Sequence, residues 1–214
     1  KAAEAQVVRQ QLYEDAAREY QILAQPDEGE DADLRLEAAW AFQRQGRVYR
    51  AMKRTDDAKH SLEQATAAIE SLIRDAGTSE KRRYAWAICR DATGAVFADS
   101  TQFAEAQRAF EQAQRELELL TQGSPDEPLY RLARGGTLVN LGQLLKDTRR
   151  YTEAEQVLRS ARRELDEAVV RAGNDGMDAD RRFAVTQAQH TLGSTLSAVG
   201  RSAEAEELFA SAIE

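Results

Sequence analysis

The residue types that most often carry chemistry are scarce in this chain. His60 and His190 are its two histidines and Cys89 is its single cysteine, and none of them has a second metal ligand at zinc-site spacing. We therefore expect no metal site, and we interpret Cys89 as a small buried hydrophobic group or an idle thiol. A single cysteine also excludes an internal disulfide, which favours a reducing compartment and leads us to expect a cytoplasmic location.

Two polar segments contain carboxylates that could in principle hold a cation. Residues 27–33 are rich in Asp and Glu, and residues 174–178 contain Asn174, Asp175 and Asp178. Neither segment matches the twelve-residue calcium loop, so both are interpreted as solvated connectors. The sequence also lacks a phosphate-binding loop, a nucleophile elbow and a paired Ser and His motif. We expect no catalytic site and no cofactor here, and any catalytic domain would lie outside these 214 residues.

Arginine is the charged residue with regular spacing. An arginine stands eleven residues before each of four glycines, and a carboxylate follows three of these glycines at 24 residues. The arginines are Arg35, Arg83, Arg131 and Arg182, and the carboxylates are Glu70, Glu118 and Asp166. We predict that they pair and link successive structural units, because a planar guanidinium suits fixed contacts between helices. The alternative is a basic ladder that grips an acidic ligand.

The same glycines belong to a repeat that runs through most of the chain. Each is followed by an alanine after twelve residues, a bulky apolar residue after sixteen and another alanine after nineteen. The sets are Gly46, Ala58, Leu62 and Ala65; Gly94, Ala106, Phe110 and Ala113; Gly142, Ala154, Leu158 and Ala161; and Gly193, Ala205, Phe209 and Ala212. The intervals between the glycines are 48, 48 and 51 residues. Because the last three positions share one face of a helix, the pattern predicts stacked helix pairs.

The elements that position these residues follow from the same periodicity. We predict paired helices over residues 33–52 and 56–76, 80–99 and 102–121, 127–148 and 152–172, and 178–199 with a helix from 203 onward. Thr55, Thr101 and Ser202 are predicted N-caps of the second helices, and residues 25–32, 77–79, 122–126 and 173–176 are predicted loops. The predicted fold is all-α, an α-solenoid or superhelix of antiparallel helix pairs. Its units cover about 33–78, 79–125, 126–176 and 177–214, and residues 1–24 form an N-terminal partial repeat or one capping helix.

Two further features of the first helices need a structural explanation. A column of large apolar residues stands ten positions before each glycine and is predicted to be core: Leu36, Tyr84, Leu132 and Phe183. Gly135 and Gly136 interrupt a predicted helix, where each glycine costs about 1 kcal/mol relative to alanine. We interpret the pair as an adaptation to close helix packing; a kink that opens a groove is the alternative.

Composition excludes several classes of function. The formal net charge is −8, and acidic and basic residues are interspersed, which argues against nucleic-acid binding through a basic stripe. The sequence contains no run of 18 apolar residues and no signal-peptide pattern, so we expect no membrane contact. Because the chain opens at Lys1 and stops at Glu214 within a helical pattern, we expect it to be a segment of a longer protein.

The pattern over residues 33–214 resembles the tetratricopeptide repeat (TPR), and the segment from Gly200 to Ala205 is similar to the turn between the helices of that family. The resemblance implies a concave surface lined by the first helix of each pair, here called helix A. It implies a protein-interaction module or scaffold that binds a peptide or protein there, without a cofactor. The implied groove residues are Trp40, Gln43, Arg47, Arg50, Asp91, Val139, Gln143, Lys146, Gln187 and His190.

The longer spacing carries a narrower resemblance. Arrays of about 48 residues whose helix A opens with Arg83-Tyr84-Ala85 or Arg131-Leu132-Ala133 are similar to the repeat tails of large bacterial Ser/Thr protein kinases. This resemblance implies an alternative function, a ligand-sensing or peptide-sensing regulatory domain that controls an attached kinase or transcription factor. Homo-oligomer formation through the apolar ends of the array is a third possibility.

Overall fold

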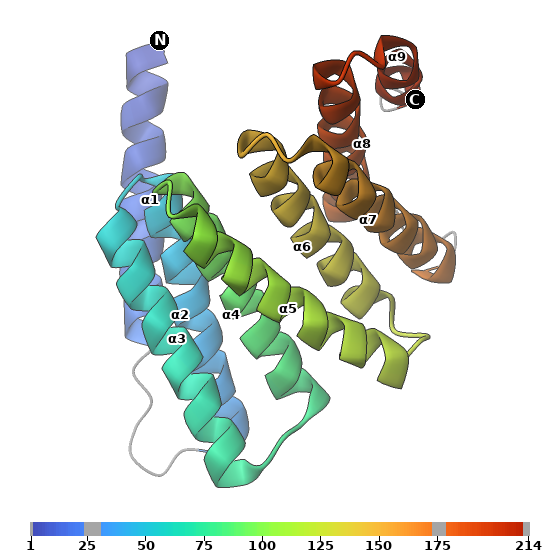
Figure 1. Ribbon diagram of the computed structural model, residues 1–214. Coiled ribbons are helices and arrows are strands. Elements are labelled where there is room, and N and C mark those ends of the chain that lie inside the picture. Colours follow the sequence, from blue (N-terminus) through green and yellow to red (C-terminus); the bar gives the residue numbers. More distant parts are fainter. Residues whose placement is uncertain (1, 24–30, 173–178, 212–214) are drawn as a thin grey trace. The chain divides into compact units, whose positions relative to one another are not determined.

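The computed structural model describes residues 2–23, 31–172 and 179–211, and every regular element in these ranges is an α-helix (Figure 1). The chain divides into two compact units, residues 1–101 and 102–214, which are described separately. The fold is all-α, and each unit consists of neighbouring helices packed as in a TPR-like solenoid, as the sequence predicts.

The helices begin and end close to their predicted positions. The first unit contains α1 (Ala2–Leu23), α2 (Ala32–Ala51), α3 (Thr55–Ala76) and α4 (Glu80–Asp99). The second contains α5 (Phe103–Gly123), α6 (Pro128–Asp147), α7 (Tyr151–Ala172), α8 (Ala179–Ala198) and α9 (Ser202–Ser211). The helix bounds after residue 31 agree with the sequence prediction to within two residues. Most of the predicted loops at 25–32 and 173–176, the acidic residues before Asp31, the segment 174–178 and Ala212 lie outside the described residues.

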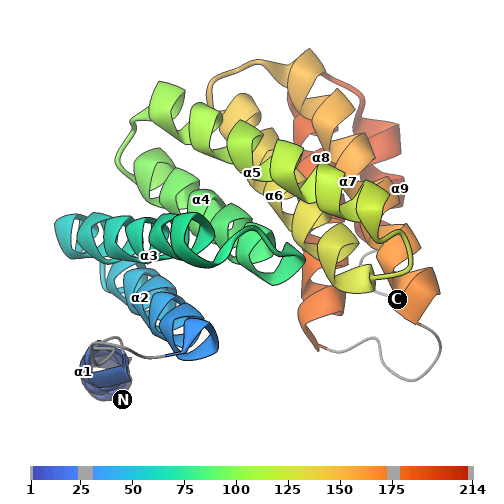
Figure 2. The ribbon, with the colours of Figure 1, turned by 90° about the horizontal axis from the view of Figure 1, so that it is seen from below.

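In the first unit, α2 contacts α1, α3 and α4 (Figure 2). Its core contains small side chains between the helices and branched ones at their centre: Leu36, Ala39, Ala65, Ile69, Leu72, Ala85 and Cys89. Ala58 and Leu62 of α3 form a second cluster with Ala92 and Val96 of α4. The alanines of the repeat are therefore buried where two helices approach closely, and the large residue between them fills the remaining space.

In the second unit, α6 contacts α5, α7 and α8, and α8 also contacts α7 and α9. The core cluster joins three of these helices through Leu138, Val139, Ala161, Leu165 and Ala188. Leu132 is partly buried against this cluster. Phe183, the last member of the predicted apolar column, is 68% exposed. The prediction that Phe183 is core is wrong. Burial of Phe183 would need a covering side chain from the neighbouring helix, and the sequence of α8 does not determine that side chain.

The repeat glycines mark contacts between paired helices that leave no room for a side chain. A Cβ added at Gly46 would lie 2.7 Å from Leu62 Cγ, and one at Gly142 would lie 2.5 Å from Leu158 Cγ. Gly193 has the equivalent contact with the Phe209 ring, 2.7 Å from its Cε1 atom. The glycine and the bulky residue sixteen positions later are thus one packing pair, which explains why the sequence keeps their spacing.

The two adjacent glycines of α6 have different environments. A Cβ at Gly135 would lie 2.6 Å from Leu165 Cγ, whereas a Cβ at Gly136 would meet nothing within 4 Å. Helix α6 continues through both residues. The packing interpretation is confirmed for Gly135, and packing gives no reason for a glycine at position 136.

Each turn from helix A to the second helix of a pair, helix B, contains a residue with positive φ, seven positions after the repeat glycine. The values are 61° for Lys53, 60° for Thr101, 63° for Arg149 and 83° for Gly200. In three of these turns the next amide donates a hydrogen bond to the last turn of helix A: Arg54 N–H to Tyr49 O at 2.9 Å, Arg150 N–H to Leu145 O at 2.8 Å and Arg201 N–H to Leu196 O at 2.9 Å. This is the Schellman arrangement.

The predicted N-caps of the second helices are wrong by one position. Helices α3 and α9 begin at Thr55 and Ser202 themselves. Thr101 instead provides the left-handed residue of its turn, and α5 is capped by Gln102 without a side-chain hydrogen bond. The tight turn explains the shift, because it places a single residue between the left-handed position and the new helix. Ser79 does cap α4, accepting a hydrogen bond from the Arg82 N–H at 3.3 Å.

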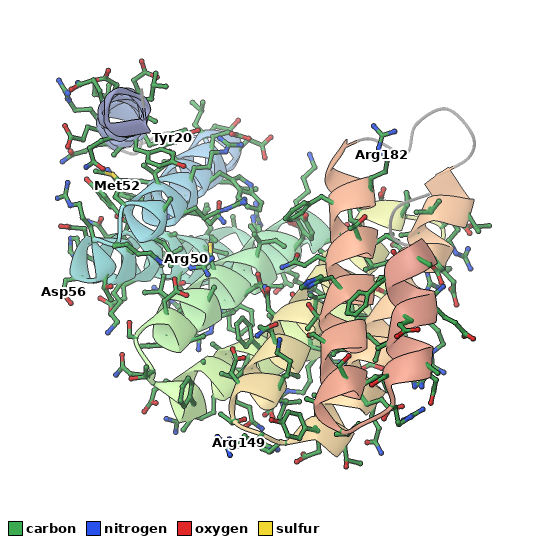
Figure 3. The ribbon with its side chains drawn as sticks, turned by 90° about the horizontal axis from the view of Figure 1, so that it is seen from above. Tyr20, Arg50, Met52, Asp56, Arg149 and Arg182 are labelled. Carbon is green, nitrogen blue, oxygen red and sulfur yellow. The ribbon has the colours of Figure 1, made fainter. Side chains whose placement is uncertain are left out.

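The N-terminal segment forms one helix, α1, that packs against α2. The buried Gln45 side chain donates a hydrogen bond to the Ala17 carbonyl at 3.0 Å and accepts one from the Ser61 hydroxyl at 3.0 Å. Figure 3 shows Tyr20 directed from α1 toward α2. Gln45 therefore connects three helices of the first unit through one side-chain amide.

Candidate protein-binding surface

The implied groove residues of the first unit have three different environments. Trp40 packs against Tyr84 of α4, with ring centroids 6.0 Å apart at 49°. Gln43 is 3% exposed, so its side chain contributes to helix packing and presents almost no surface to a partner. Arg47 is exposed on α2, and Asp91 is half-buried on α4 with intramolecular contacts.

Arg50 joins two neighbouring helices of the first unit. Its Nε donates to Asp99 Oδ2 at 2.8 Å, and its Nη2 donates to Asp99 Oδ1 at 3.3 Å. This two-point contact ties the end of α2 to the end of α4. The Arg50 charge is already paired, so Arg47 is the arginine of this face with more capacity to attract an anion.

In the second unit, the candidate side chains lie on α6 and α8. Val139 is 1% exposed and belongs to the core cluster of this unit. Gln143 donates to Asp147 Oδ1 at 2.7 Å, and Lys146 Nζ donates to the Ser194 hydroxyl at 3.1 Å, which links α6 to α8. Gln187 and His190 are exposed on α8.

His190 is also an aromatic neighbour of the last helix. Its ring centroid lies 5.7 Å from that of Phe209 on α9, at an interplanar angle of 49°. Seven of the implied groove residues fall into three sets by exposure. Arg47, Gln187 and His190 are exposed, and Gln143 and Lys146 are half-buried; Gln43 and Val139 support packing.

Two members of the arginine column pair with carboxylates, as predicted, but not with the predicted ones. Arg35 Nη2 lies 2.8 Å from Asp75 Oδ2, and Arg131 Nη1 lies 3.1 Å from Glu164 Oε2 and 2.9 Å from Glu167 Oε2. Each contact joins the two helices of one pair. The predicted link between successive pairs through these arginines is wrong, because their guanidinium groups face the second helix of their own pair.

Two of the three carboxylates predicted for that role, Glu70 and Glu118, do connect successive helix pairs, but their partner stands at a different position of helix A. Glu70 on α3 accepts a hydrogen bond from Trp86 Nε1 on α4 at 3.1 Å. Glu118 on α5 accepts one from Arg134 Nη2 on α6 at 3.0 Å. Trp86 and Arg134 both stand eight residues before a repeat glycine. Asp166 pairs instead within its own helix, with Arg162 Nε at 3.6 Å.

A further ladder of charges was missed at the start of the second helices. Arg150 and Arg201 follow the left-handed turn residue and bind carboxylates three residues later, with Arg150 Nε 2.7 Å from Glu153 Oε1 and Arg201 Nε 2.6 Å from Glu204 Oε1. Each arginine also reaches the preceding helix B. Arg150 Nη1 donates to Gln107 Oε1 at 2.7 Å, and Arg201 Nη1 donates to Glu155 at 2.7 and 2.8 Å. The sequence pattern that predicts this contact is a basic residue eight positions after a repeat glycine and an acidic residue eleven positions after the same glycine.

The ladder changes the proton affinity of its carboxylates. Hydrogen bonds from Arg150 lower the pKa of Glu153, and hydrogen bonds from Arg201 lower the pKa of Glu204. Burial alone would raise the pKa of Glu155, but hydrogen bonds from Arg159 and Arg201 outweigh it, and the pKa of Glu155 is lowered. Arg159 of α7 and Arg201 at the start of α9 therefore both hold Glu155 and Glu204 in their charged forms, whereas Glu153 depends on Arg150.

The remaining candidate groups have no features of a reaction centre. Cys89 is fully buried, and burial raises the pKa of its thiol to about 12, as expected for an unreactive core cysteine. Within residues 2–23, 31–172 and 179–211, no group of three His, Cys, Asp or Glu side chains is placed to hold a metal ion. Over the same ranges, no helix has the length and apolar character needed to cross a membrane.

The second unit also carries a groove of about 850 Å³ on its helix B side, between α7 and α9. Leu192 and Leu196 of α8 form its floor, and its walls carry three arginines and three carboxylates: Arg159, Arg162, Arg163, Asp166, Glu204 and Glu207. Arg159 and Arg162 pair with carboxylates across or along these walls. The charges of this groove are balanced, and it gives no preference for an anionic or a cationic partner.

Comparison with known proteins agrees with this architecture. Two tetratricopeptide repeat family models match, one over residues 41–71, which fall in α2 and α3, and one over residues 135–169, which fall in α6 and α7. Among solved structures, the chain is similar to BtubC (BKLC) from P. vanneervenii, with a TM-score of 0.63 and 19% identity over 94% of this chain and 69% of that one. At this identity the similarity shows the fold alone. No curated protein matches the sequence.

The fold and the two repeat matches together define the class of protein. The chain is a TPR-like helical-repeat array. TPR repeats generally mediate protein–protein interaction, and the fold is typically non-catalytic.

Proposed function

We propose that this chain is a protein-interaction module or scaffold that binds a peptide or protein segment on the helix A side of its repeats. The observation that carries the proposal is the arrangement of these helices within each unit. Helix α2 contacts α4, and α6 contacts α8, so the exposed sides of neighbouring A helices form one face. Arg47, Gln187 and His190 lie exposed at the positions that the TPR resemblance assigns to a partner.

A basic side chain on the helix A side of each unit favours an acidic partner segment. In the first unit Arg47 is exposed, and in the second Lys146 contacts the hydroxyl of Ser194. Complementary charge would increase the association rate and make it depend on ionic strength. We propose that the chain contains four repeats of about 48 residues, with the boundaries predicted from the sequence, and belongs to a cytoplasmic protein. Gln43 and Val139 would hold the helices in register beneath the face.

Regulation of an attached domain is the second candidate. The resemblance of the 48-residue spacing to kinase repeat tails favours it, since a partner bound to such a tail could control the attached kinase or transcription factor. In this second function the partner would bind the same helix A face, but binding would change the activity of the attached domain. Activity of the parent protein that changes on addition of the isolated partner segment would favour regulation over scaffolding.

The test is affinity capture with this chain as bait in a lysate of its source organism, followed by mass spectrometry. The variant is Arg47→Glu combined with Lys146→Glu, which reverses two charges on the helix A side. The matched control is Arg74→Glu combined with Arg163→Glu, which makes the same change in charge at exposed positions of α3 and α7. We expect a partner that the control retains and the variant loses.

Other outcomes distinguish the alternatives. A partner retained by the variant and lost by the control would contradict the helix A assignment and point to the α7–α9 groove. A partner retained by both would contradict the role of charge on this face. Light scattering on the purified chain tests self-association directly, since a mass above 23.8 kDa that depends on concentration would identify a second copy as the occupant.

A further inference from the structure

The exposed side of α2 carries two arginines that have no ion-pair partner among the described residues. Arg44 stands two positions before the repeat glycine and Arg47 one position after it, and both are exposed. Arg50, one turn farther along the helix, is already held by Asp99 through contacts of 2.8 and 3.3 Å. Two guanidinium groups of α2 are therefore available to an external anion.

An aromatic pair lies directly beside these arginines. Trp40 of α2 stands four residues before Arg44 and seven before Arg47, a spacing that places all three on one side of the helix. The Trp40 ring packs against the ring of Tyr84 on α4, with centroids 6.0 Å apart, and both residues are half-buried. This contact holds Trp40 in place and leaves part of it accessible next to two positive charges.

Packing of the repeat does not explain the two charges. The positions equivalent to Arg44 and Arg47 in the other A helices are all uncharged: Ala92 and Ala95 in α4, Asn140 and Gln143 in α6, and Thr191 and Ser194 in α8. Those helices pack without an arginine at either position, and within the described part of the chain neither arginine of α2 makes an ion pair that would stabilise the first unit. The charges are particular to α2, which favours contact with a partner over a role in the scaffold.

The charges of α2 are also ordered along the helix. Its carboxylates, those of Asp33 and Glu37, belong to its amino-terminal half, and both residues are exposed. Arg44 and Arg47 belong to its carboxyl-terminal half, and at 1.5 Å per residue Arg44 follows Glu37 by about 10 Å along the helix axis. The surface therefore attracts negative charge at one end and repels it at the other, which fixes the direction in which a charged segment can lie.

We propose that Arg44, Arg47 and Trp40 bind an acidic segment of the partner protein that also carries an apolar side chain. Carboxylates of the segment pair with the two guanidinium groups, each of which can hold a carboxylate by two parallel hydrogen bonds. The apolar side chain covers the accessible part of Trp40, and the part of the segment that reaches Glu37 is basic or neutral. This inference rests on the proposed function and adds the residues that anchor the partner and the direction in which the partner lies.

The test is selection from a displayed library of random twelve-residue peptides without tryptophan on the purified full chain, followed by fluorescence-anisotropy titration of the labelled enriched peptides. We expect these peptides to combine Asp or Glu residues with an apolar residue. Arg44→Glu should weaken their binding by about tenfold, and Arg44→Glu combined with Arg47→Glu should weaken it further. Arg74→Glu makes the same change in charge at an exposed position of α3 and is the matched control, which should retain the affinity.

Tryptophan emission locates the bound peptide independently of affinity. The chain contains two tryptophans, so Trp86→Phe leaves Trp40 as the only one. Binding of an enriched peptide should change the emission of this variant. It should leave unchanged the emission of the Trp40→Phe variant, in which Trp86 is the reporter. Circular dichroism melting checks that each variant is folded, and Arg44→Glu, at an exposed position, stays informative if a tryptophan substitution disturbs the first unit.

Several results would overturn this site. These are enriched peptides without acidic residues, no enrichment at all, or an affinity that Arg44→Glu leaves unchanged. Peptides that bind the Arg44→Glu chain as before but lose affinity for a Lys146→Glu chain would place the acidic partner on the helix A side of the second unit. That result would overturn this site alone and leave the proposed function standing. Peptides insensitive to Arg44→Glu, Arg47→Glu and Lys146→Glu would contradict both.

Discussion

Arg134 binds Glu118 across the junction between α5 and α6, with Nη2 3.0 Å from Oε1, and its other terminal nitrogen binds Glu164 of α7 at 2.8 Å. One guanidinium thus holds three consecutive helices of the second unit. The side chains of Arg134 and Glu164 are 17% and 16% exposed, so their ion pair is largely removed from water, whereas Glu118 is 39% exposed. The equivalent position in the first unit is Trp86, which reaches Glu70 with an indole N–H. An indole N–H in the first unit and a guanidinium in the second therefore donate to glutamates at equivalent repeat positions, Glu70 and Glu118.

Arg134→Ala should therefore destabilise the second unit. Loss of the guanidinium leaves the mostly buried Glu164 with one partner fewer and also removes the link to Glu118, at a cost of about 1–3 kcal/mol. Arg134→Lys should recover only part of it, because one ammonium cannot bind both carboxylates in the fork geometry. Urea unfolding followed by circular dichroism measures the difference. Arg108→Ala, at an exposed arginine on α5, is the control and should change stability by less than about 0.5 kcal/mol.

Arg131→Ala should likewise lower stability, since Arg131 binds Glu164 and Glu167 between α6 and α7. We expect a loss of about 1–3 kcal/mol without a change in the affinity for a groove partner. Unfolding curves and peptide titrations on the same preparation separate the two effects. Reduced affinity at unchanged stability would mean that the arginine column binds a ligand, as in the basic-ladder alternative.

The adjacent glycines of α6 give a matched pair of substitutions. Gly135→Ala would bring a methyl group to 2.6 Å from Leu165 Cγ and should destabilise the fold by about 1–3 kcal/mol. Gly136→Ala meets nothing within 4 Å and should stabilise it by up to about 1 kcal/mol through helix propensity. Thermal and urea unfolding of the two variants should show opposite signs. Equal effects at both positions would contradict the packing described for α6.

The left-handed turn residues predict a gain in stability. Arg149 has a φ of 63° in the turn between α6 and α7, and its exposed side chain projects outward (Figure 3). Arg149→Gly removes the steric cost of the left-handed conformation and should stabilise the protein by about 1 kcal/mol, less the added freedom of the unfolded chain. Arg149→Ala retains a Cβ and is the control, for which no gain is expected. A stabilised alanine variant would show that the benefit came from removing charge and not from the backbone.

Stability should fall in acid partly through the arginine ladder. The pKa values of Glu155 and Glu204 are lowered in the folded state, so their contribution is present above the unfolded pKa of about 4.3 and is lost as the pH falls through the lower folded values. Arg201→Gln should therefore destabilise the protein at pH 7, and its difference from the unmodified protein should shrink between about pH 5 and pH 3. Melting temperatures across this range measure it. A difference independent of pH would show that Arg201 acts by packing alone.

Much of the fold could be predicted from the sequence because the interactions that determine it are local. The bounds of α2 to α9 follow from apolar periodicity and turn residues within each segment, and the structure places them within two residues of the prediction. The glycine and the large residue sixteen positions later, such as Gly142 and Leu158, face each other across a single tight turn. A short connection leaves two helices few ways to pack, so their contact recurs with the sequence period.

Details of the turns and of the polar contacts could not be predicted in the same way. The N-cap expectation failed at Thr55 because the Schellman turn shifts the helix start by one residue. The partner of Arg131 depends on which side of α7 faces α6, and a long side chain can reach several carboxylates one turn apart. Sequence spacing alone does not distinguish Glu164 and Glu167 from Asp166.

The sequence by itself determined that this chain is an all-helical repeat array, since periodic apolar faces have no other way to be buried than against the next helix. Only the tertiary structure decided which positions remain open to a partner. Phe183 belongs to the same sequence column as the buried Leu36, yet it is 68% exposed. Exposure is a property of two helices together, because the space beside a residue on one helix is filled or left open by the residue that the neighbouring helix brings there.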